Sequence, residues 1–204
     1  MKKSGAVLSL SKKVCLLGDF AVGKTSLVRR FVYDLFEDKY LSTIGVKVSR
    51  KMVAVPKDDA TIELTIMLWD LADSKEFDSI RVSYLRGTAG AVAACDLTRP
   101  STIDGLYKYS RELRAINPGA HLILVANKTD LADQQSVTGA QIEAVARDIN
   151  APFYLTSART GKNVDEVFRH LARLLVTRLP PESVAEHHIL KTGRGRFQLN
   201  QLAQ

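Results

Sequence analysis

The sequence has few of the features that mark secreted, disulfide-bonded or membrane-spanning proteins. Only two of its 204 residues are cysteines, Cys15 and Cys95, and both lie in apolar runs typical of buried strands. We interpret them as small core residues and expect no structural disulfide. No apolar stretch approaches the ~20 residues of a membrane-spanning helix, and residues 4–10 are too short and too weakly apolar for a secretory signal. We therefore expect a cytoplasmic protein.

The sequence also has no stretch in which charge of one sign is concentrated. The formal net charge is +7, but lysines and arginines are spread along the chain, which favours solvated faces over a nucleic-acid or membrane surface. The array of aromatic and basic residues that binds nucleic acid is missing. His187 and His188 stand together without cysteine or carboxylate at ligand spacing, so they predict no metal site. Hydrophobic residues make up 46% of the chain, which is typical of one folded domain.

The most informative stretch is residues 18–25, which read Gly-Asp-Phe-Ala-Val-Gly-Lys-Thr and match the phosphate-binding pattern G-x-x-x-x-G-K-[ST]. It lies between a strand expected at 14–17 and a helix expected at 25–35, which is the context that this motif requires. Backbone N–H groups of such a loop point at phosphates, Lys24 reaches the terminal phosphates, and the Thr25 hydroxyl can ligate Mg²⁺. We expect nucleotide contacts from Gly18, Ala21, Val22, Gly23, Lys24, Thr25 and Ser26.

Strand and helix patterns alternate along the rest of the chain. Further strands are expected at 46–55, 62–69, 89–95, 121–126 and 153–156, and helices at 80–85, 101–115, 138–149 and 164–179. The first two of these strands predict a hairpin, and Thr138 with Gln141 predicts a helix cap. The alternation predicts the α/β class, with a mostly parallel six-stranded sheet covered by helices on both faces. Residues 1–10 are expected as an N-terminal arm, 11–180 as the folded domain and 181–204 as a tail.

Two polar motifs follow the later strands and indicate which base is bound. The motif Asn127-Lys128-Thr129-Asp130 comes directly after the strand at 121–126. The Asp130 carboxylate can accept paired hydrogen bonds from the N1–H and the exocyclic amine of guanine, a pattern that adenine does not offer. Ser157, Ala158 and Arg159 follow the last strand, where a backbone N–H can reach the guanine carbonyl. Because ligands bind at the carboxyl ends of such strands, these motifs predict a guanine-nucleotide site.

Together these motifs resemble the Ras-like small GTPases, and most closely their Rab branch, over residues 12–179. Residues 40–46 resemble the first switch of that family, Trp69-Asp70 the start of its second switch and residues 84–87 the end. The resemblance implies a P-loop G domain that binds GTP or GDP with Mg²⁺, hydrolyses GTP, and meets effector and regulator proteins through the switches. It implies phosphate and magnesium roles for Lys24, Thr25 and Thr43, action of Asp70 on Mg²⁺ through water, base stacking by Phe36, base recognition by Asn127, Lys128 and Asp130, and a backbone contact at Ala158.

The second switch departs from the family pattern Asp-x-Ala-Gly-Gln, because this chain reads Asp70-Leu71-Ala72-Asp73-Ser74. Asp73 keeps the N–H that the family's glycine offers the γ-phosphate, but it adds a carboxylate. Two charges ~4 Å apart repel by roughly 4 kcal/mol at an effective dielectric of about 20, so Asp73 either points away or weakens triphosphate binding. Ser74 is shorter than the glutamine that orients water in the family, which predicts slow intrinsic hydrolysis.

The candidate catalytic residues are thus Lys24, Thr43 and Ser74, and several alternatives stay open. Phe20 is bulky where related chains have a small or polar residue, and it can obstruct an incoming arginine. Water can instead be positioned by Glu76 or by a partner, and a pseudo-GTPase that serves as a nucleotide-bound scaffold is the second hypothesis.

Two surface features and the lipid anchor complete the expectations. Trp69 is interpreted as a strand residue that packs on the sheet, with an effector contact as the alternative. Lys47, Arg50 and Lys51 are interpreted as a solvated basic face, with an acidic partner as the alternative. The family usually ends in lipidated cysteines, but no cysteine follows Cys95 and Met1-Lys2-Lys3 offers no glycine for myristoylation. We therefore expect no lipid anchor, and membrane contact only through a partner or basic residues.

Overall fold

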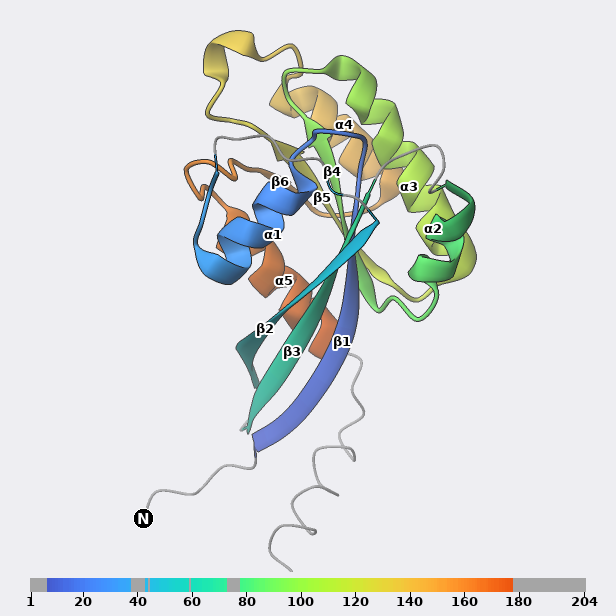
Figure 1. Cartoon of the computed structure of the whole chain (residues 1–204), viewed down its shortest axis with the longest axis vertical. Helices are drawn as coiled ribbons and strands as arrows, with labels where there is room; N and C mark the ends of the chain where they lie inside the picture. The colour runs from blue at the N-terminus through green and yellow to red at the C-terminus, as the bar shows by residue number, and fades with distance from the viewer. Residues whose placement is uncertain (1–6, 38–42, 44, 59, 73–77, 178–204) are drawn as a thin grey trace, which may run out of the picture.

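A six-stranded sheet forms the centre of the molecule (Figure 1). The computed structural model describes residues 7–37, 43, 45–58, 60–72 and 78–177. The strands are β1 (Val7–Leu17), β2 (Val46–Lys57), β3 (Ala60–Leu71), β4 (Gly90–Asp96), β5 (His121–Asn127) and β6 (Phe153–Leu155), in the order β2-β3-β1-β4-β5-β6. β2 and β3 form an antiparallel hairpin, whereas every other neighbouring pair is parallel. The predicted α/β class with a mostly parallel sheet is therefore confirmed.

Helices cover both faces of this sheet. They are α1 (Lys24–Tyr33), α2 (Asp78–Leu85), α3 (Ile103–Ile116), α4 (Gly139–Ile149) and α5 (Val164–Thr177), with short 3₁₀ turns at Pro100–Thr102 and Ala132–Gln134. Successive side chains of a strand point to opposite faces, so Leu16 of β1 joins the core under α1 and α5 while Leu17 joins the core under α2, α3 and α4. Every residue of β4 is buried, as expected for a central strand covered on both sides.

A local capping signal positions the start of α4 as predicted. The Thr138 hydroxyl accepts a hydrogen bond from the Gln141 N–H, and the Gln141 side chain accepts one from the Thr138 N–H. This reciprocal cap begins α4 at the expected place. On the opposite face, the rings of Phe31 in α1 and Phe168 in α5 stack with centroids 4.2 Å apart, which joins the first and last helices.

β1 starts earlier than the sequence predicted, so the expected N-terminal arm at residues 1–10 is wrong for the part from Val7 onward. β1 pairs with β3 from Val7 opposite Thr61 onward, and the Leu8 side chain is only 3% exposed. The physical reason is that β3 is long enough to extend the sheet past its other strands, and Figure 1 shows β1, β2 and β3 reaching beyond the helices at one end. Likewise β2 runs through Pro56, which an edge strand tolerates, where a turn was expected.

Candidate functional site

The loop between β1 and α1 is shaped by close contacts at two glycines. Gly18 has φ +136° and Gly23 has φ +100°, conformations that favour glycine. A Cβ on Gly18 would lie 2.3 Å from the Ala94 carbonyl oxygen, and one on Gly23 would lie 2.3 Å from Nδ2 of Asn127. The ends of β4 and β5 therefore press against the loop, which explains why the motif needs glycine at both positions.

The same loop presents positive charge at the start of α1. Gly23 is the N-cap and has no side chain to cap the helix, and the first turn holds no acidic residue. The positive end of the helix dipole and its first N–H groups are thus left for an anion. Nζ of Lys24 donates to the carbonyl oxygens of Gly18 at 2.5 Å and Asp19 at 3.0 Å. These bonds fold the lysine over the loop, so the cation and the helix end act at one place.

A cavity of about 300 Å³ extends from this loop to the segments that follow β5 and β6. It brings together most of the residues that the motifs predicted, because the carboxyl ends of parallel strands meet at one edge of a sheet. The predicted residues that line it are Ala21, Gly23, Lys24, Thr25, Ser26, Phe36, Thr43, Asn127, Lys128, Asp130, Ala158 and Arg159. The cavity is also lined by residues that sequence reasoning did not propose as ligand contacts, namely Phe20, Arg29, Glu37, Leu71, Ala72 and Leu131.

Three oxygen-bearing side chains cluster where the cavity meets the end of β3. Oγ1 of Thr25 lies 2.6 Å from Oγ1 of Thr43 and donates to Oδ2 of Asp70 at 2.5 Å. Asp70 is only 1% exposed, and its Oδ1 finds no hydrogen-bond partner among the described residues. Burial raises the pKa of the Asp70 carboxyl, and the Thr25 hydrogen bond and the nearby cations, including Lys24, oppose that rise. A buried carboxylate oxygen without a partner beside two hydroxyls fits a small hard cation such as Mg²⁺.

At the far end of the cavity, Asn127 connects the phosphate loop with the segment after β6. Its Nδ2 donates to the Val22 carbonyl at 3.0 Å, and its Oδ1 accepts from the Ala158 N–H at 3.1 Å and the Thr156 hydroxyl at 3.2 Å. The backbone N–H expected to meet the guanine carbonyl is thus engaged with Asn127 in this structure. The hydroxyl of Ser157 donates to Oδ1 of the neighbouring Asp130 at 2.6 Å, which holds that carboxylate at the cavity.

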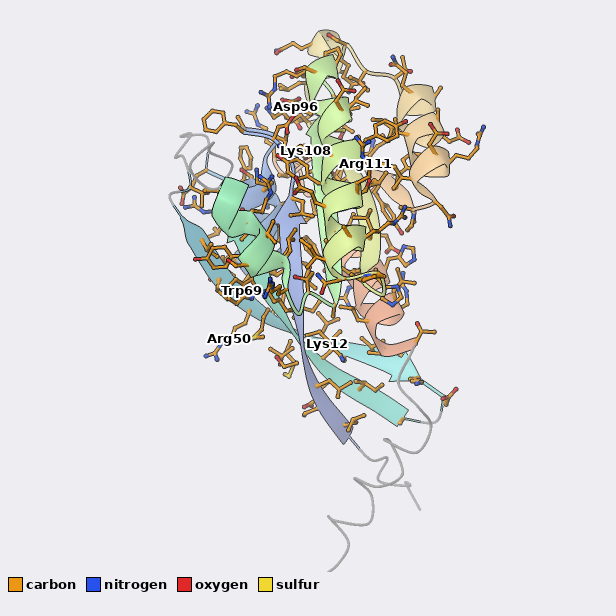
Figure 2. The ribbon with its side chains drawn as sticks, turned by 90° about the vertical axis from the view of Figure 1, so that its right-hand side faces the viewer. Lys12, Arg50, Trp69, Asp96, Lys108 and Arg111 are labelled. Atoms are coloured by element: carbon orange, nitrogen blue, oxygen red, sulfur yellow. The ribbon has the colours of Figure 1, made fainter. Side chains whose placement is uncertain are left out.

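A further carboxylate behind this end of the site was missed by sequence reasoning. Asp96, at the end of β4, is fully buried, and its Oδ2 lies 2.7 Å from Nζ of Lys128 and 2.9 Å from Nε of Arg99. Figure 2 labels it near the upper end of the molecule. Arg99 also donates to the Phe20 carbonyl at 2.6 Å. Asp96 therefore links the base-recognition motif to the phosphate loop, and its place directly after a buried strand is the signal that could have identified it.

The remaining predicted residues stand apart from the cavity or lie outside the described residues. Asp73, Ser74 and the alternative Glu76 belong to the second group. Among the described residues, Gly18, Val22 and Ser157 do not line the cavity. Instead the Gly18 carbonyl accepts from Lys24, the Val22 carbonyl accepts from Asn127, and the Ser157 hydroxyl donates to Asp130. Phe20, by contrast, lines the cavity and is 52% exposed.

Trp69 lies half-buried on β3, beside α2 (Figure 2). Its ring centroid is 6.0 Å from that of Tyr84, and Nζ of Lys13 lies 4.1 Å from the ring centroid on its face. Across the hairpin it pairs with Val48 of β2, which is half exposed. These residues leave an aromatic and apolar surface between the ends of the two expected switches.

Comparison with known proteins agrees with this arrangement. The model of the Ras family matches residues 13–177, which is most of the chain. The chain belongs to the Ras family. It is 38% identical over 176 residues to the Ras-related protein RABF2b of Arabidopsis thaliana, and the alignment covers 86% of each chain. This Ras-family chain is therefore a small GTPase of the Rab branch, as the resemblance implied, and proteins of this kind bind guanine nucleotides. Within the described part of the chain, no helix is long and apolar enough to cross a membrane.

Proposed function

We propose that this Ras-family protein is a Mg²⁺-dependent guanine-nucleotide switch whose intrinsic GTP hydrolysis is slow. The observation that carries the proposal is the cluster of Thr25, Thr43 and Asp70 oxygens beside an anion-binding loop and its lysine. The two hydroxyls would hold Mg²⁺ directly and Asp70 would act on it through water. A bound Mg²⁺ would neutralise charge on the β- and γ-phosphates. Lys24, released from the loop carbonyls, would place its ammonium on the same phosphates.

Base choice is assigned to the motif after β5. Asp130 would accept the paired N–H donors of guanine, while Asn127 and Lys128 would support the base from the loop that Asp96 holds in place. The amino group of adenine faces the carboxylate with the wrong pattern of donors, so adenine nucleotides are expected to bind far more weakly. The predicted stacking contact belongs to Phe36, which lines this cavity.

The slow hydrolysis rests on residues 73 and 74. Ser74 cannot reach the place from which a glutamine amide orients the attacking water. Asp73 adds a carboxylate to the residue whose N–H would meet the γ-phosphate, and its charge would weaken triphosphate binding unless the side chain points away. A nucleotide-bound scaffold that does not hydrolyse GTP at all is the second candidate, and the same two residues favour it.

The output of the switch is assigned to the surface that carries both switch segments. Partner proteins would dock on residues 43–46 and on the stretch from Asp70 to Tyr84. Trp69 and Val48 would supply the apolar contact. Effectors and regulators would then distinguish the GTP form from the GDP form by the arrangement of these segments.

A single-turnover experiment tests the reaction. The bound nucleotide is identified by chromatography after purification, the protein is loaded with GTP, and cleavage is followed without any partner. We expect bound guanine nucleotide and cleavage well below the rate typical of the family. The double variant Asp73→Gly with Ser74→Gln should cleave at least about tenfold faster, whereas Lys24→Ala should lose the nucleotide.

Three outcomes would contradict parts of this proposal. Cleavage by the unmodified protein at a family-typical rate would show that Ser74 is not limiting. A double variant with unchanged, slow cleavage would move the defect elsewhere, for example to Phe20. Complete absence of cleavage in both proteins, with nucleotide still bound, would favour the scaffold.

A further inference from the structure

Two adjacent arginines near the end of α1 contact two different segments of the nucleotide cavity. Nη1 of Arg29 lies 2.5 Å from Oε2 of Glu37, and both residues line the cavity. Arg30 donates from Nε to the Ala158 carbonyl at 2.9 Å and from Nη2 to the Arg159 carbonyl at 2.6 Å. The C-terminal part of α1 thus contacts both the segment that follows α1 and the segment that follows β6.

The helical geometry separates the two side chains. Neighbouring residues of an α-helix point about 100° apart, so Arg29 and Arg30 face different loops. Arg29 follows Thr25 by four residues and therefore shares the cavity face with it. Its positive charge also acts to lower the pKa of the Asp70 carboxyl, in opposition to burial, which is the larger influence and raises it. The guanidinium thus belongs to the electrostatic surroundings of the cavity.

Arg30 is itself held by the end of its own helix. Its Nη1 donates to the Asp34 carbonyl at 3.1 Å and to Oδ1 of Asp34 at 3.0 Å. Asp34 is the C-cap of α1 and has a left-handed backbone with φ +54°. The planar guanidinium is therefore fixed on one side, and its other two nitrogens donate to two successive carbonyls. A lysine has a single ammonium and cannot reproduce this fork.

The two segments that the arginines hold carry residues at the base end of the cavity. Glu37 directly follows Phe36, and the carbonyl that Arg30 meets belongs to Ala158, whose N–H is bonded to Asn127. Phe36, Ala158 and Asn127 all line the cavity. If a ligand at this end is released by movement of one of the two segments away from α1, that movement breaks contacts of one arginine.

We propose that Arg29 and Arg30 are positioning residues that set how slowly a guanine nucleotide leaves the site. Arg29 acts through Glu37 on the segment of Phe36, and Arg30 acts through two backbone carbonyls on the segment of Ala158. The inference rests on the proposed guanine-nucleotide binding and adds the residues that govern retention. The Arg29 pair is partly exposed and therefore sensitive to salt, whereas the backbone contacts of Arg30 are bonds to neutral acceptors and less sensitive.

The test is the release rate of a fluorescent GDP from the loaded full-length chain into excess unlabelled GDP. The variants are Arg29→Ala, Glu37→Ala, Arg29→Glu combined with Glu37→Arg, Arg30→Ala and Arg30→Lys. Arg147→Ala is the matched control, because Arg147 pairs with Glu143 on α4, is largely exposed, and is not among the described residues that line the cavity.

We expect Arg29→Ala and Arg30→Ala each to release GDP at least about fivefold faster, and Arg147→Ala to release it at the unmodified rate. The charge-swapped pair should return towards the unmodified rate, while Arg30→Lys should stay fast. Release from the unmodified protein should accelerate with salt, and this dependence should be lost in Arg29→Ala.

The inference is overturned if both alanine variants release GDP at the unmodified rate. It is also overturned if the charge swap restores nothing and the thermal unfolding midpoint in excess GDP falls in every variant in proportion to release, because that pattern marks a merely structural role. An unmodified protein that retains no guanine nucleotide would overturn the proposed function, and the inference with it.

Discussion

Asp96 is a fully buried carboxylate that lies between two cations. Burial by itself raises the pKa of this carboxyl. The hydrogen bond from Lys128 and those from the Thr98 N–H and hydroxyl outweigh that effect, and the pKa lies below its usual range. The charged form is therefore favoured in the folded protein, and the contacts to Lys128 and Arg99 depend on that charge.

Substitution Asp96→Asn is expected to lower the free energy of unfolding at pH 7 by about 2 kcal/mol, because hydrogen bonds to a charged group are lost. A carboxyl group whose pKa is lower in the folded than in the unfolded chain stabilises the fold, and this stabilisation is fully present above the pKa of the unfolded chain. That stability is lost as the pH falls through the folded value. The difference in free energy of unfolding between the unmodified protein and Asp96→Asn, here called the gap, should thus be constant down to about pH 4 and shrink below it. Urea unfolding at pH 7, 5, 4 and 3 measures this gap.

The control for this prediction is Asp165→Asn. Asp165 pairs with Arg169 on the exposed side of α5, and such surface pairs contribute only about 0–1 kcal/mol. A gap between Asp96→Asn and the unmodified protein that is the same at pH 3 and pH 7 would mean that the charge of Asp96 does not stabilise the fold.

Among the elements, a substitution in β1 can test whether the extended end of the sheet unfolds cooperatively with the rest of the domain. Leu8 is buried beside Val55 and Ile62, at the end of the sheet that reaches past the helices. Leu8→Ala should lower the free energy of unfolding by about 2–4 kcal/mol, because it removes buried methyl groups and leaves a cavity. Denaturant unfolding with an unchanged slope on urea concentration measures the change.

Ser9→Ala is the matched control on the same strand. Ser9 is exposed, and its hydroxyl donates to Oε2 of Glu63 at 3.2 Å, so this substitution should change stability by less than about 0.5 kcal/mol. Equal, small effects of both substitutions would show that residues 7–10 do not pack against the core.

The start of β1 also marks a boundary of sequence-based prediction. The capping residues of α4 and the glycine-rich loop were predictable because each signal lies within a few residues of its partner. The early start of β1 depends on pairing between Val7 and Thr61, which no local pattern reveals. The site divides in the same way: Lys24 and Asp130 follow from local motifs, whereas Arg30 meets Ala158 across 128 positions of the chain. Contacts of that kind are set by how the elements pack.

At the scale of the whole molecule, the cavity couples distant parts of the fold. Its lining comes from the loop before α1, α1 itself, residues 36, 37 and 43, the end of β3, and the segments after β5 and β6. The helices and strands among these contribute to the cores on both faces of the sheet. A ligand that binds only the folded chain stabilises it by about 2.7 kcal/mol at a concentration one hundred times its dissociation constant. Bound nucleotide should therefore stabilise the domain as one unit.

We expect GDP with Mg²⁺, at such a concentration, to raise the thermal unfolding midpoint by about 5–10 °C, given roughly 2–4 °C for each kcal/mol in a chain of this size. ADP should cause little shift, because Asp130 selects guanine. Removal of Mg²⁺ with a chelator should reduce the GDP shift. In Asp70→Asn the shift should be smaller and respond less to the chelator, because the carboxylate that acts on Mg²⁺ through water is gone while the Thr25 and Thr43 hydroxyls remain. Equal shifts with GDP and ADP would contradict the base assignment, and a chelator effect as large in Asp70→Asn as in the unmodified protein would contradict the action of Asp70 on Mg²⁺.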